Sequence, residues 1–308
     1  MKKVGAGLLA GVLAPGAAWA CACGCGVFEV GTSSMFPDGV GGMAFLNYDF
    51  QDQNQNWSDS SKAPAANNND KEIRTDFITV GLQYMFNTSW GVQAELPFAD
   101  RNFKTISNAS GNPGTSVEWA SLGDIRIKAI YTGFSADLSS GVSFGLRLPT
   151  GSFSHENSFD DVDRDTQIGS GSTDVLLGGF YRGNLTQDKK WDWFAQAELD
   201  LPVLTQGDYR PGFEVDAAAG IDYKGWSLGR LRISPVAQVI ASERTKDYGA
   251  DAHSNNSGYT RILLSPGIEF HLHPVKVYAD VELPVFQHIT GNQLVAPALF
   301  KLNISYMF

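Results

Sequence analysis

The sequence has no apolar run long enough to cross a membrane as a helix. Of its 308 residues 43% are hydrophobic, and the mean hydropathy is −0.15. Beyond residue 20, no stretch approaches the ~20 apolar residues that a membrane helix requires. A protein that spans a membrane with helices is therefore excluded.

Cysteine and histidine are also scarce. The chain has three cysteines, all within residues 21–26, and five histidines. So few cysteines exclude a framework of disulfides, and without a Cys-x-x-Cys-His stretch no attached haem is expected. The 33 glycines instead suit a sheet protein with tight turns.

Basic residues are fewer than acidic ones. The chain has 23 Lys and Arg against 33 Asp and Glu, which gives a formal net charge of −10. The first twenty residues carry two of the lysines, Lys2 and Lys3, so that their removal makes the charge about −12. An acidic chain binds nucleic acid poorly, and we expect no nucleic-acid partner.

The first residues have the pattern of a secretory signal peptide. A basic start at residues 1–3 is followed by a small, apolar stretch over 4–17 and by Ala18-Trp19-Ala20, which fits an A-x-A cleavage site. This predicts a signal peptide over residues 1–20 and Cys21 as the first mature residue. Lipidation of Cys21 remains an alternative, although such a cysteine usually has a branched apolar residue three places before it, where Ala18 stands.

The end of the chain alternates between apolar and polar residues. In residues 301–308, Leu302, Ile304, Tyr306 and Phe308 would share one face of a strand, and the polar residues between them the other. Eleven earlier segments alternate in the same way: 43–51, 78–86, 90–98, 125–131, 142–148, 175–181, 193–201, 213–223, 231–239, 262–270 and 275–283.

These segments predict an all-β fold, a closed antiparallel transmembrane β-barrel of about twelve strands over residues 43–308. Long polar connections follow the first, third, fifth and ninth segments, whereas the connections near Asn87, Lys224 and His271 are short. Strands of about ten residues, an even strand number and alternating long and short connections are typical of bacterial outer-membrane barrels. We therefore expect an outer-membrane location and lipid as a partner.

A soluble β-sandwich is the alternative, because its strands also alternate. One sheet could not bury an apolar face that runs across twelve strands, and the aromatic residues gather near the short turns, as in an interfacial girdle. These residues are Tyr84, Phe86, Trp90, Tyr131, Tyr181, Trp191, Tyr223, Trp226, Tyr306 and Phe308.

Four Leu-Pro pairs recur at the ends of expected strands. These strands run toward the end of the barrel that carries the long connections. Proline removes a donor from the ladder, so we expect each pair to end its strand. The pairs are Leu96-Pro97, Leu148-Pro149, Leu201-Pro202 and Leu283-Pro284.

Three stretches carry a resemblance to a known family. They are Leu122-Gly123-Asp124-Ile125, Gly145-Leu146-Arg147-Leu148-Pro149-Thr150-Gly151 and Gly169-Ser170-Gly171-Ser172-Thr173-Asp174. With them, residues 73–308 resemble a family of bacterial outer-membrane proteins linked to the meta pathway of phenol degradation. The resemblance implies a barrel transporter that passes small organic molecules, such as aromatic or other hydrophobic compounds.

The segment 21–42 precedes the expected barrel and is rich in cysteine and glycine. Cys21, Cys23 and Cys25 could present three soft thiolates to Cu(I) or Zn(II), which would suit a metal-binding or electron-transfer accessory. An oxidised or lipid-modified tail is the alternative reading. Apart from such a soft metal no cofactor is expected. The segment lies in the periplasm or in the lumen, and whether it plugs the bore is left open.

The polar faces of the strands predict a charged lumen. The side chains expected there are Glu95, Arg126, Lys128, Arg147, Glu198, Asp200, Glu214, Asp216, Arg232, Arg261, Glu269, Lys276, Asp280, Glu282 and Lys301. Charges of both signs could create a transverse field or a salt-bridged plug. Because about twelve strands enclose a bore narrower than that of open porins, we expect passive passage of small solutes through a narrow channel.

Two further expectations concern enzymatic activity and assembly. A membrane hydrolase would need a serine and a histidine together, and the adjacent pair Ser154-His155 lies in an expected loop without an evident orienting residue. We therefore expect no enzyme and no catalytic residues. The aromatic Phe308 at the end of a strand resembles the signal that the barrel assembly machinery recognises, which makes that machinery an expected partner.

Overall fold

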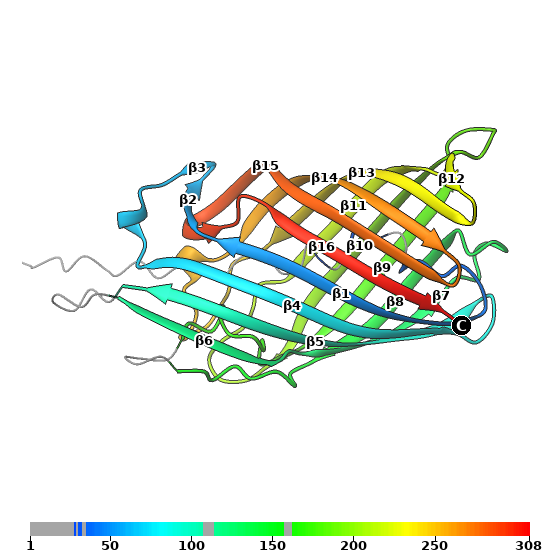
Figure 1. Ribbon diagram of the computed structural model, residues 1–308. Helices are drawn as coiled ribbons and strands as arrows, with labels where there is room; N and C mark the ends of the chain where they lie inside the picture. Colours follow the sequence, from blue (N-terminus) through cyan, green and yellow to red (C-terminus); the bar gives the residue numbers. More distant parts are fainter. Residues whose placement is uncertain (1–27, 29, 33–34, 107–113, 157–161) are drawn as a thin grey trace, which may run out of the picture.

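The computed structural model describes residues 28, 30–32, 35–106, 114–156 and 162–308. One antiparallel sheet closes into a barrel, because β1 pairs with β4 on one side and with β16 on the other (Figure 1). In the described residues, none of the helices is long and apolar enough to span a membrane.

The wall strands are long and tilted. Their bounds are β1 (Gly41–Gln53), β4 (Asp70–Met85), β5 (Trp90–Thr105), β6 (Thr115–Leu122), β7 (Ile125–Tyr131), β8 (Ser140–Leu148), β9 (Ser172–Asn184), β10 (Trp191–Thr205), β11 (Glu214–Tyr223), β13 (Leu231–Arg244), β14 (Tyr259–Leu272), β15 (Val275–Val295) and β16 (Leu299–Met307).

The barrel has twelve wall positions, which confirms the prediction from the sequence. Strands β6 and β7 share one wall position, since both pair with β5. Strand β6 pairs with the C-terminal half of β5, and β7 pairs with its N-terminal half. Three short strands, β2 (Gln55–Asp59), β3 (Ser61–Lys62) and β12 (Trp226–Leu228), extend the sheet beyond the wall. Because bacterial barrels have short periplasmic turns, the end that carries the C-terminus is periplasmic and the other end is extracellular.

The strands form because their residues alternate with a period of two. On β4, Ile78, Val80 and Leu82 point outward and are exposed, whereas Thr75 and Gln83 point inward and are buried. Outward aromatic pairs stand near the periplasmic end, with ring centroids 4.8 Å apart for Trp90 and Tyr131. The wall thus presents an apolar belt with an aromatic girdle to its surroundings.

The first and last strands close the barrel at its periplasmic end. Met43 faces Met307, the amide of Gly42 donates to the carbonyl of Phe308 at 2.7 Å, and the amide of Phe308 donates back at 2.8 Å. A Cβ at Gly42 would lie 2.2 Å from the Phe308 ring, so this close approach requires glycine. The barrel was expected to start at residue 43, and β1 begins slightly earlier, at Gly41.

Several strands extend further on the extracellular side than the sequence indicated. The long polar connection expected after the segment 90–98 is partly wrong, because β5 continues to Thr105 and pairs there with the additional strand β6. Strand β15 continues to Val295 and pairs with β2. The extracellular ends of these strands need no apolar face toward lipid. Their sequences therefore lack the alternation that identifies the membrane-spanning part of the wall.

The Leu-Pro pairs do not end strands as a rule. Only Leu148-Pro149 stands at a strand end, whereas Pro97, Pro202 and Pro284 lie within β5, β10 and β15. Each of the three occupies a break in the ladder: Pro97 lies opposite the gap between β6 and β7, and register shifts accompany Pro202 and Pro284. At such irregularities no amide is needed for pairing, and proline is tolerated.

The wall itself is interrupted between β6 and β9 on the extracellular side. Within the described chain β6 pairs with β5 alone, and β8 already ends at Leu148. Three glycines meet at the base of this interruption, since a Cβ at Gly151 would lie 2.8 Å from Gly169 and 2.9 Å from Gly123. The chain after β8 turns inward here and narrows the lumen.

Candidate solute pathway in the barrel lumen

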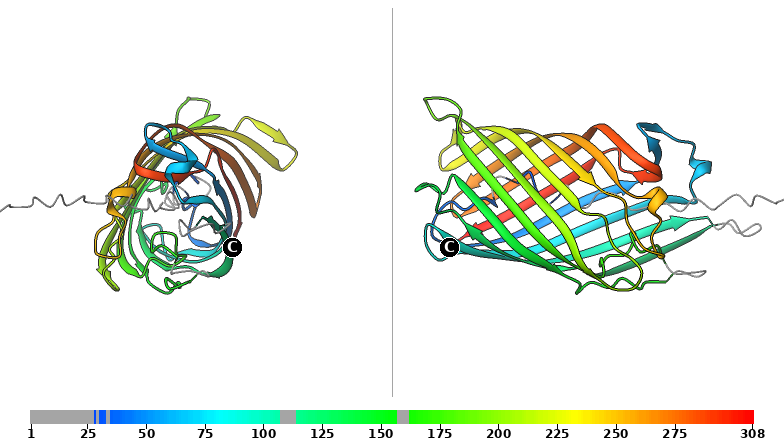
Figure 2. Two further views of the ribbon diagram at one scale, coloured as in Figure 1. Left: turned by 90° about the vertical axis from the view of Figure 1, so that its left-hand side faces the viewer. Right: turned by 180° about the vertical axis from the view of Figure 1, so that it is seen from behind.

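The described residues of 28–40, called the N-terminal segment below, run along the inside of the barrel toward β1. Phe28 and Val30 pack in the outer half of the lumen against a cluster of Ala218, Ile240, Leu263, Ala296 and Leu299. Phe36 packs lower, stacked on Phe180 with ring centroids 4.6 Å apart. The view along the barrel in Figure 2 shows the ring of strands around this space. The segment that the sequence placed in the periplasm or the lumen therefore lies, in its described part, in the lumen.

Polar side chains of the wall bind the backbone of the N-terminal segment. Lys301 donates to the carbonyl of Val30 at 2.7 Å, and Gln83 donates to that of Met35 at 3.2 Å. The amide of Gly31 donates to Gln196 at 3.2 Å. A segment outside any ladder needs such partners, because a buried backbone group without one is costly.

An ion-pair clamp holds the periplasmic end of this segment. Asp38 pairs with Arg182 at 2.7 Å and also with Lys276, while Arg182 donates to the carbonyl of Pro37 at 2.7 Å. Burial alone would raise the pKa of Asp38, but Lys276 and Arg182 together lower it to about 2. The Asp38 clamp is therefore fully charged at neutral pH.

All fifteen charged side chains that the sequence assigned to the lumen lie on the inner face of the wall. Most of them contact an opposite charge: Lys128 binds Glu198 at 2.8 Å, and Arg126 lies 3.9 Å from Glu95. Lys301 lies 3.5 Å from Glu282. The remaining residues on this face are Asp200, Glu214, Asp216, Arg147, Arg232, Arg261, Glu269, Lys276 and Asp280.

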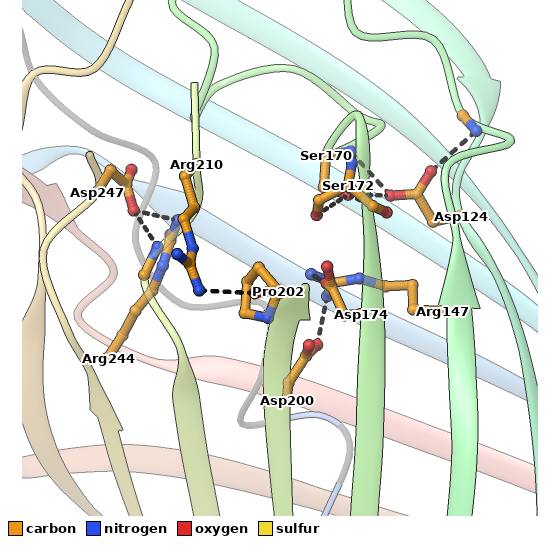
Figure 3. A network of polar contacts seen from close by, with 12 residues as sticks. Asp124, Arg147, Ser170, Ser172, Asp174, Asp200, Pro202, Arg210, Arg244 and Asp247 are labelled. Atoms are coloured by element: carbon orange, nitrogen blue, oxygen red, sulfur yellow. Dashed lines mark hydrogen bonds and ion pairs between the residues drawn. The ribbon is translucent and has the colours of Figure 1, made fainter. Parts of the chain in front are cut away.

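One arginine connects three strands. Arg147 on β8 pairs with Asp174 on β9 and, at 2.6 Å, with Asp200 on β10 (Figure 3). Of the two alternatives, a transverse field or a salt-bridged interior, these contacts favour the second. Asp174 was not predicted as a lumen residue, although it alternates with Leu176 and Gly178 and could have been found by extending the strand.

All three stretches that carried the family resemblance meet at the wall interruption. The carboxylate of Asp124 accepts from the amide of Gly151 at 2.9 Å and from the amide and hydroxyl of Ser170 at 2.8 and 2.6 Å (Figure 3). The hydroxyl of Thr150 donates to the carbonyl of Gly123 at 3.0 Å. The Leu-Gly-Asp and Leu-Pro-Thr-Gly stretches thus fix the start and the end of the chain between β8 and β9.

The described residues 162–171, called the inward loop below, cover the outer part of the lumen. Arg101 on β5 donates to the carbonyls of Thr166 and Gln167. Val162 and Ile168 pack into a cluster with the wall residues Ile73, Phe103, Val117, Trp119 and Leu294. Neither contact was expected, because Arg101 and Phe103 lie beyond the predicted end of their strand.

Three cavities follow one another beside the N-terminal segment. The lower cavity, at the periplasmic mouth, has a volume of about 430 Å³, the middle cavity about 90 Å³ and the upper cavity about 170 Å³. Phe36, Pro37 and Gln83 border both the lower and the middle cavity. Phe28, Asp49, Thr79 and Arg126 border both the middle and the upper one. The three cavities thus form a row along the barrel, separated by side chains.

The serine and histidine pair and the three cysteines were the other candidate sites. His155 stacks on Trp119 with ring centroids 4.6 Å apart, and in the described residues no hydrogen bond joins it to Ser154. Cys21, Cys23 and Cys25, together with the expected signal peptide, lie outside the described residues. Within the part of the chain that is described, no three His, Cys, Asp or Glu side chains form a metal site.

No known family model matches the sequence, and a search of the curated proteins finds no match. The structure is similar to an outer membrane channel from Pseudomonas putida F1, with a TM-score of 0.66 and 12% identity over 91% of this chain and 100% of that chain. It is also similar to the β domain of the Bordetella autotransporter BrkA, with a TM-score of 0.51 and 14% identity over 87% of this chain and 100% of that one.

These likenesses show the fold, since a channel and an autotransporter domain share it and fold does not fix function. The resemblance to the phenol-degradation family stays a prediction. The closed twelve-stranded barrel, its apolar belt and its aromatic girdle, together with these outer-membrane neighbours, identify the chain as an outer-membrane β-barrel of bacterial type.

Proposed function

We propose that the protein is a narrow outer-membrane channel that passes small organic solutes beside the N-terminal segment. The observation that carries this proposal is the row of lower, middle and upper cavities, in which neighbours share bordering residues. Small movements of Phe28 and Phe36 would join the three cavities. Such a path admits single small molecules and excludes chains of sugars or peptides.

The size and lining of the cavities favour amphipathic, ring-sized solutes. A cavity of ~150 Å³ holds a benzene molecule, and the upper cavity has about 170 Å³. Phe28 and Phe77 border it beside Thr79 and several charged groups. A solute with an apolar body and a polar group would find partners for both, which agrees with the aromatic or hydrophobic compounds implied by the family resemblance.

Liposome flux tests this function with a matched pair of tryptophan variants. Thr79 borders both the middle and the upper cavity, whereas the neighbouring Val80 points outward and is 55% exposed. In the purified full-length protein, Thr79→Trp should strongly reduce the uptake of phenol and the single-channel conductance, and Val80→Trp should leave both near wild type. A wild-type barrel that passes neither ions nor phenol contradicts the proposal.

We further propose that Phe308 is read by the barrel assembly machinery. Its support is the position of Phe308 at the exposed periplasmic end, where its ring covers Gly42 and its backbone completes the last ladder. Deletion of Phe308 should lower the amount of folded barrel in the outer membrane more than it lowers transport per barrel. Heat-modified mobility of the membrane fraction measures folding, and normal insertion of the deletion variant would refute this role.

A further inference from the structure

Arg164 of the inward loop has an unusual environment among the arginines that border the upper cavity. Its guanidinium carbon lies 4.6 Å from the ring centroid of Phe153 and 4.9 Å from that of Tyr209. One nitrogen donates to the carbonyl of Ser170 at 3.3 Å, and the buried Nε has no partner in the described residues. Contacts with two aromatic rings hold the guanidinium in place without using its N–H groups as donors.

The charge of Arg164 is not balanced by a neighbouring carboxylate. Within the described chain no carboxylate lies within 4.0 Å of it, whereas Arg126, Arg147 and Arg244 have such partners at 3.9, 2.6 and 2.8 Å. Five acidic residues border the same cavity: Asp124 binds Gly151 and Ser170, Asp200 binds Arg147, Glu214 accepts from Tyr259, and Asp49 and Asp165 are the other two. Arg164 is thus the cationic group best able to receive an anion in the upper cavity.

The backbone around Arg164 is built to seat its side chain. Gly171 has φ +67, and a Cβ there would lie 2.6 Å from Nη2 of Arg164 and 3.1 Å from the ring of Phe153. Any other residue at this position would displace the guanidinium or strain the backbone. The position of Arg164 therefore follows from the fold of the loop and is not that of a freely moving surface arginine.

The apolar side of the upper cavity complements this cation. Phe77, Pro97, Ile168 and Pro211 border the same space as Arg164. A planar guanidinium binds a carboxylate through two parallel hydrogen bonds, and the volume of about 170 Å³ accommodates one aromatic ring. The two features together select a molecule with a carboxylate at one end and a compact apolar body at the other.

We propose that the upper cavity is a binding site for small aromatic carboxylates, with Arg164 as the residue that binds the carboxylate. The proposal rests on the proposed channel function and names the class of solute that the channel selects. The site holds the acid at the outer part of the lumen, between the extracellular mouth and the middle cavity.

Binding of benzoate to the purified full-length protein tests the site, with benzyl alcohol as the neutral analogue of similar shape. Titration calorimetry should show saturable benzoate binding that Arg164→Gln weakens at least about tenfold, because a charge-assisted pair is lost. Arg164→Lys, which keeps the charge but lacks the planar fork, should fall between the two. Arg210→Gln is the matched control, since Arg210 donates to Pro202 near the same end of the barrel and does not border the upper cavity.

The outcomes separate the site from the channel. Absence of saturable benzoate binding, or equal benzoate affinity in wild type and Arg164→Gln, overturns the site even where phenol passes the barrel in liposomes. Conversely, Arg164-dependent benzoate binding in a barrel that passes no solute supports the site and refutes the channel. A thermal unfolding curve like that of wild type shows that each variant is folded, and Arg164→Lys provides the comparison where Arg164→Gln does not fold.

Discussion

Two segments occupy the lumen, and they are held in different ways. In the described residues, the N-terminal segment is continuous with one wall strand, β1, and its polar contacts include the charged side chains of Lys301, Arg182 and Lys276. The inward loop is joined to the wall at both ends, by β8 and β9, and packs through an apolar cluster around Val162 and Ile168. The first segment can leave the lumen without any change in the wall, whereas the second cannot.

This difference indicates which segment limits passage. Both segments pack through apolar clusters, but in the described residues only the inward loop is continuous with a wall strand on each side, so the N-terminal segment can move with less change in the wall. We therefore expect the N-terminal segment to govern conductance and the inward loop to govern which solutes enter. The following changes test that division, from the largest expected effect to the smallest.

Deletion of residues 28–40 should have the largest effect. It removes Phe28 and Phe36 from the borders of the cavities and leaves the barrel wall complete. Single-channel conductance in planar bilayers should rise several-fold, and the thermal stability should fall, because apolar residues around Leu263 and Leu299 become exposed to water. Unchanged conductance would mean that the path beside the segment, and not the segment, limits flow.

Asp38→Asn should have a smaller effect in the same direction. It removes the charge that binds Arg182 and Lys276, so the segment should detach for short periods and produce brief openings toward the conductance of the deletion variant. Asp188→Asn is the control, because Asp188 bonds within its own periplasmic turn, to Thr186 at 2.6 Å. Equal open probability in the two variants would argue against the Asp38 clamp.

The pH dependence of the Asp38 clamp has a definite sign. Its pKa in the folded protein is about 2, below the ordinary value of 3.8, so the clamp stabilises the docked segment fully above pH 3.8. This contribution is lost as the pH falls through about 2. Wild-type conductance should therefore stay constant in the neutral range and increase only in strong acid, and Asp38→Asn should remove that increase.

Asp124→Ala should act on the inward loop with little effect on conductance. The change leaves the amides of Gly151 and Ser170 without their acceptor, a loss of about 3 kcal/mol or more in local stability. Hydrogen exchange at these two amides should accelerate by about a hundredfold. Asp137→Ala is the control, since that carboxylate accepts from Ser139 in a distant turn. Slow exchange in Asp124→Ala would show that apolar packing alone fixes the loop.

The contrast between the two segments also explains what the sequence could reveal. Residues such as Arg126, Glu198 and Lys276 could be assigned to the inner face because a period of two fixes their side without knowledge of any partner. The contacts of Asp38 and Phe28 depend on strands that are distant in the sequence, and no local pattern marks them. The same holds for Arg164, whose environment is created by two loops that meet only in the folded barrel.

The Leu-Pro pairs and β6 show the limit of local rules. The rule that proline ends a strand fails here, because a barrel strand can pass through proline where its neighbour is interrupted, as β5 does opposite the gap between β6 and β7. The interruption itself depends on Asp124, which draws Gly151 and Ser170 together across a long stretch of sequence. The stretch around Asp124 carries part of the family resemblance, but its structural role depends on partners that lie far away in the sequence.

Replacement of His253 should have the smallest effect on the two segments. Its contribution should depend on pH in the opposite direction to that of the Asp38 clamp. It lies 3.3 Å from Asp163 and so joins the connection between β13 and β14 to the inward loop. The hydrogen bond to Asp163 raises the pKa of His253 above its ordinary 6.5, against the effect of burial, and Asp165 and Asp70 raise it further.

A histidine with a raised pKa stabilises the docked loop fully below pH 6.5, and this contribution is lost as the pH rises through the raised value. Hydrogen exchange in residues 162–171 should therefore accelerate on the alkaline side, where the Asp38 clamp stays intact. His253→Gln should exchange faster at acidic pH and lose the step, whereas His288→Gln, which removes a contact with Ser60, should keep it. If wild type shows no alkaline step, the inward loop is held without His253, and only the N-terminal segment responds to pH.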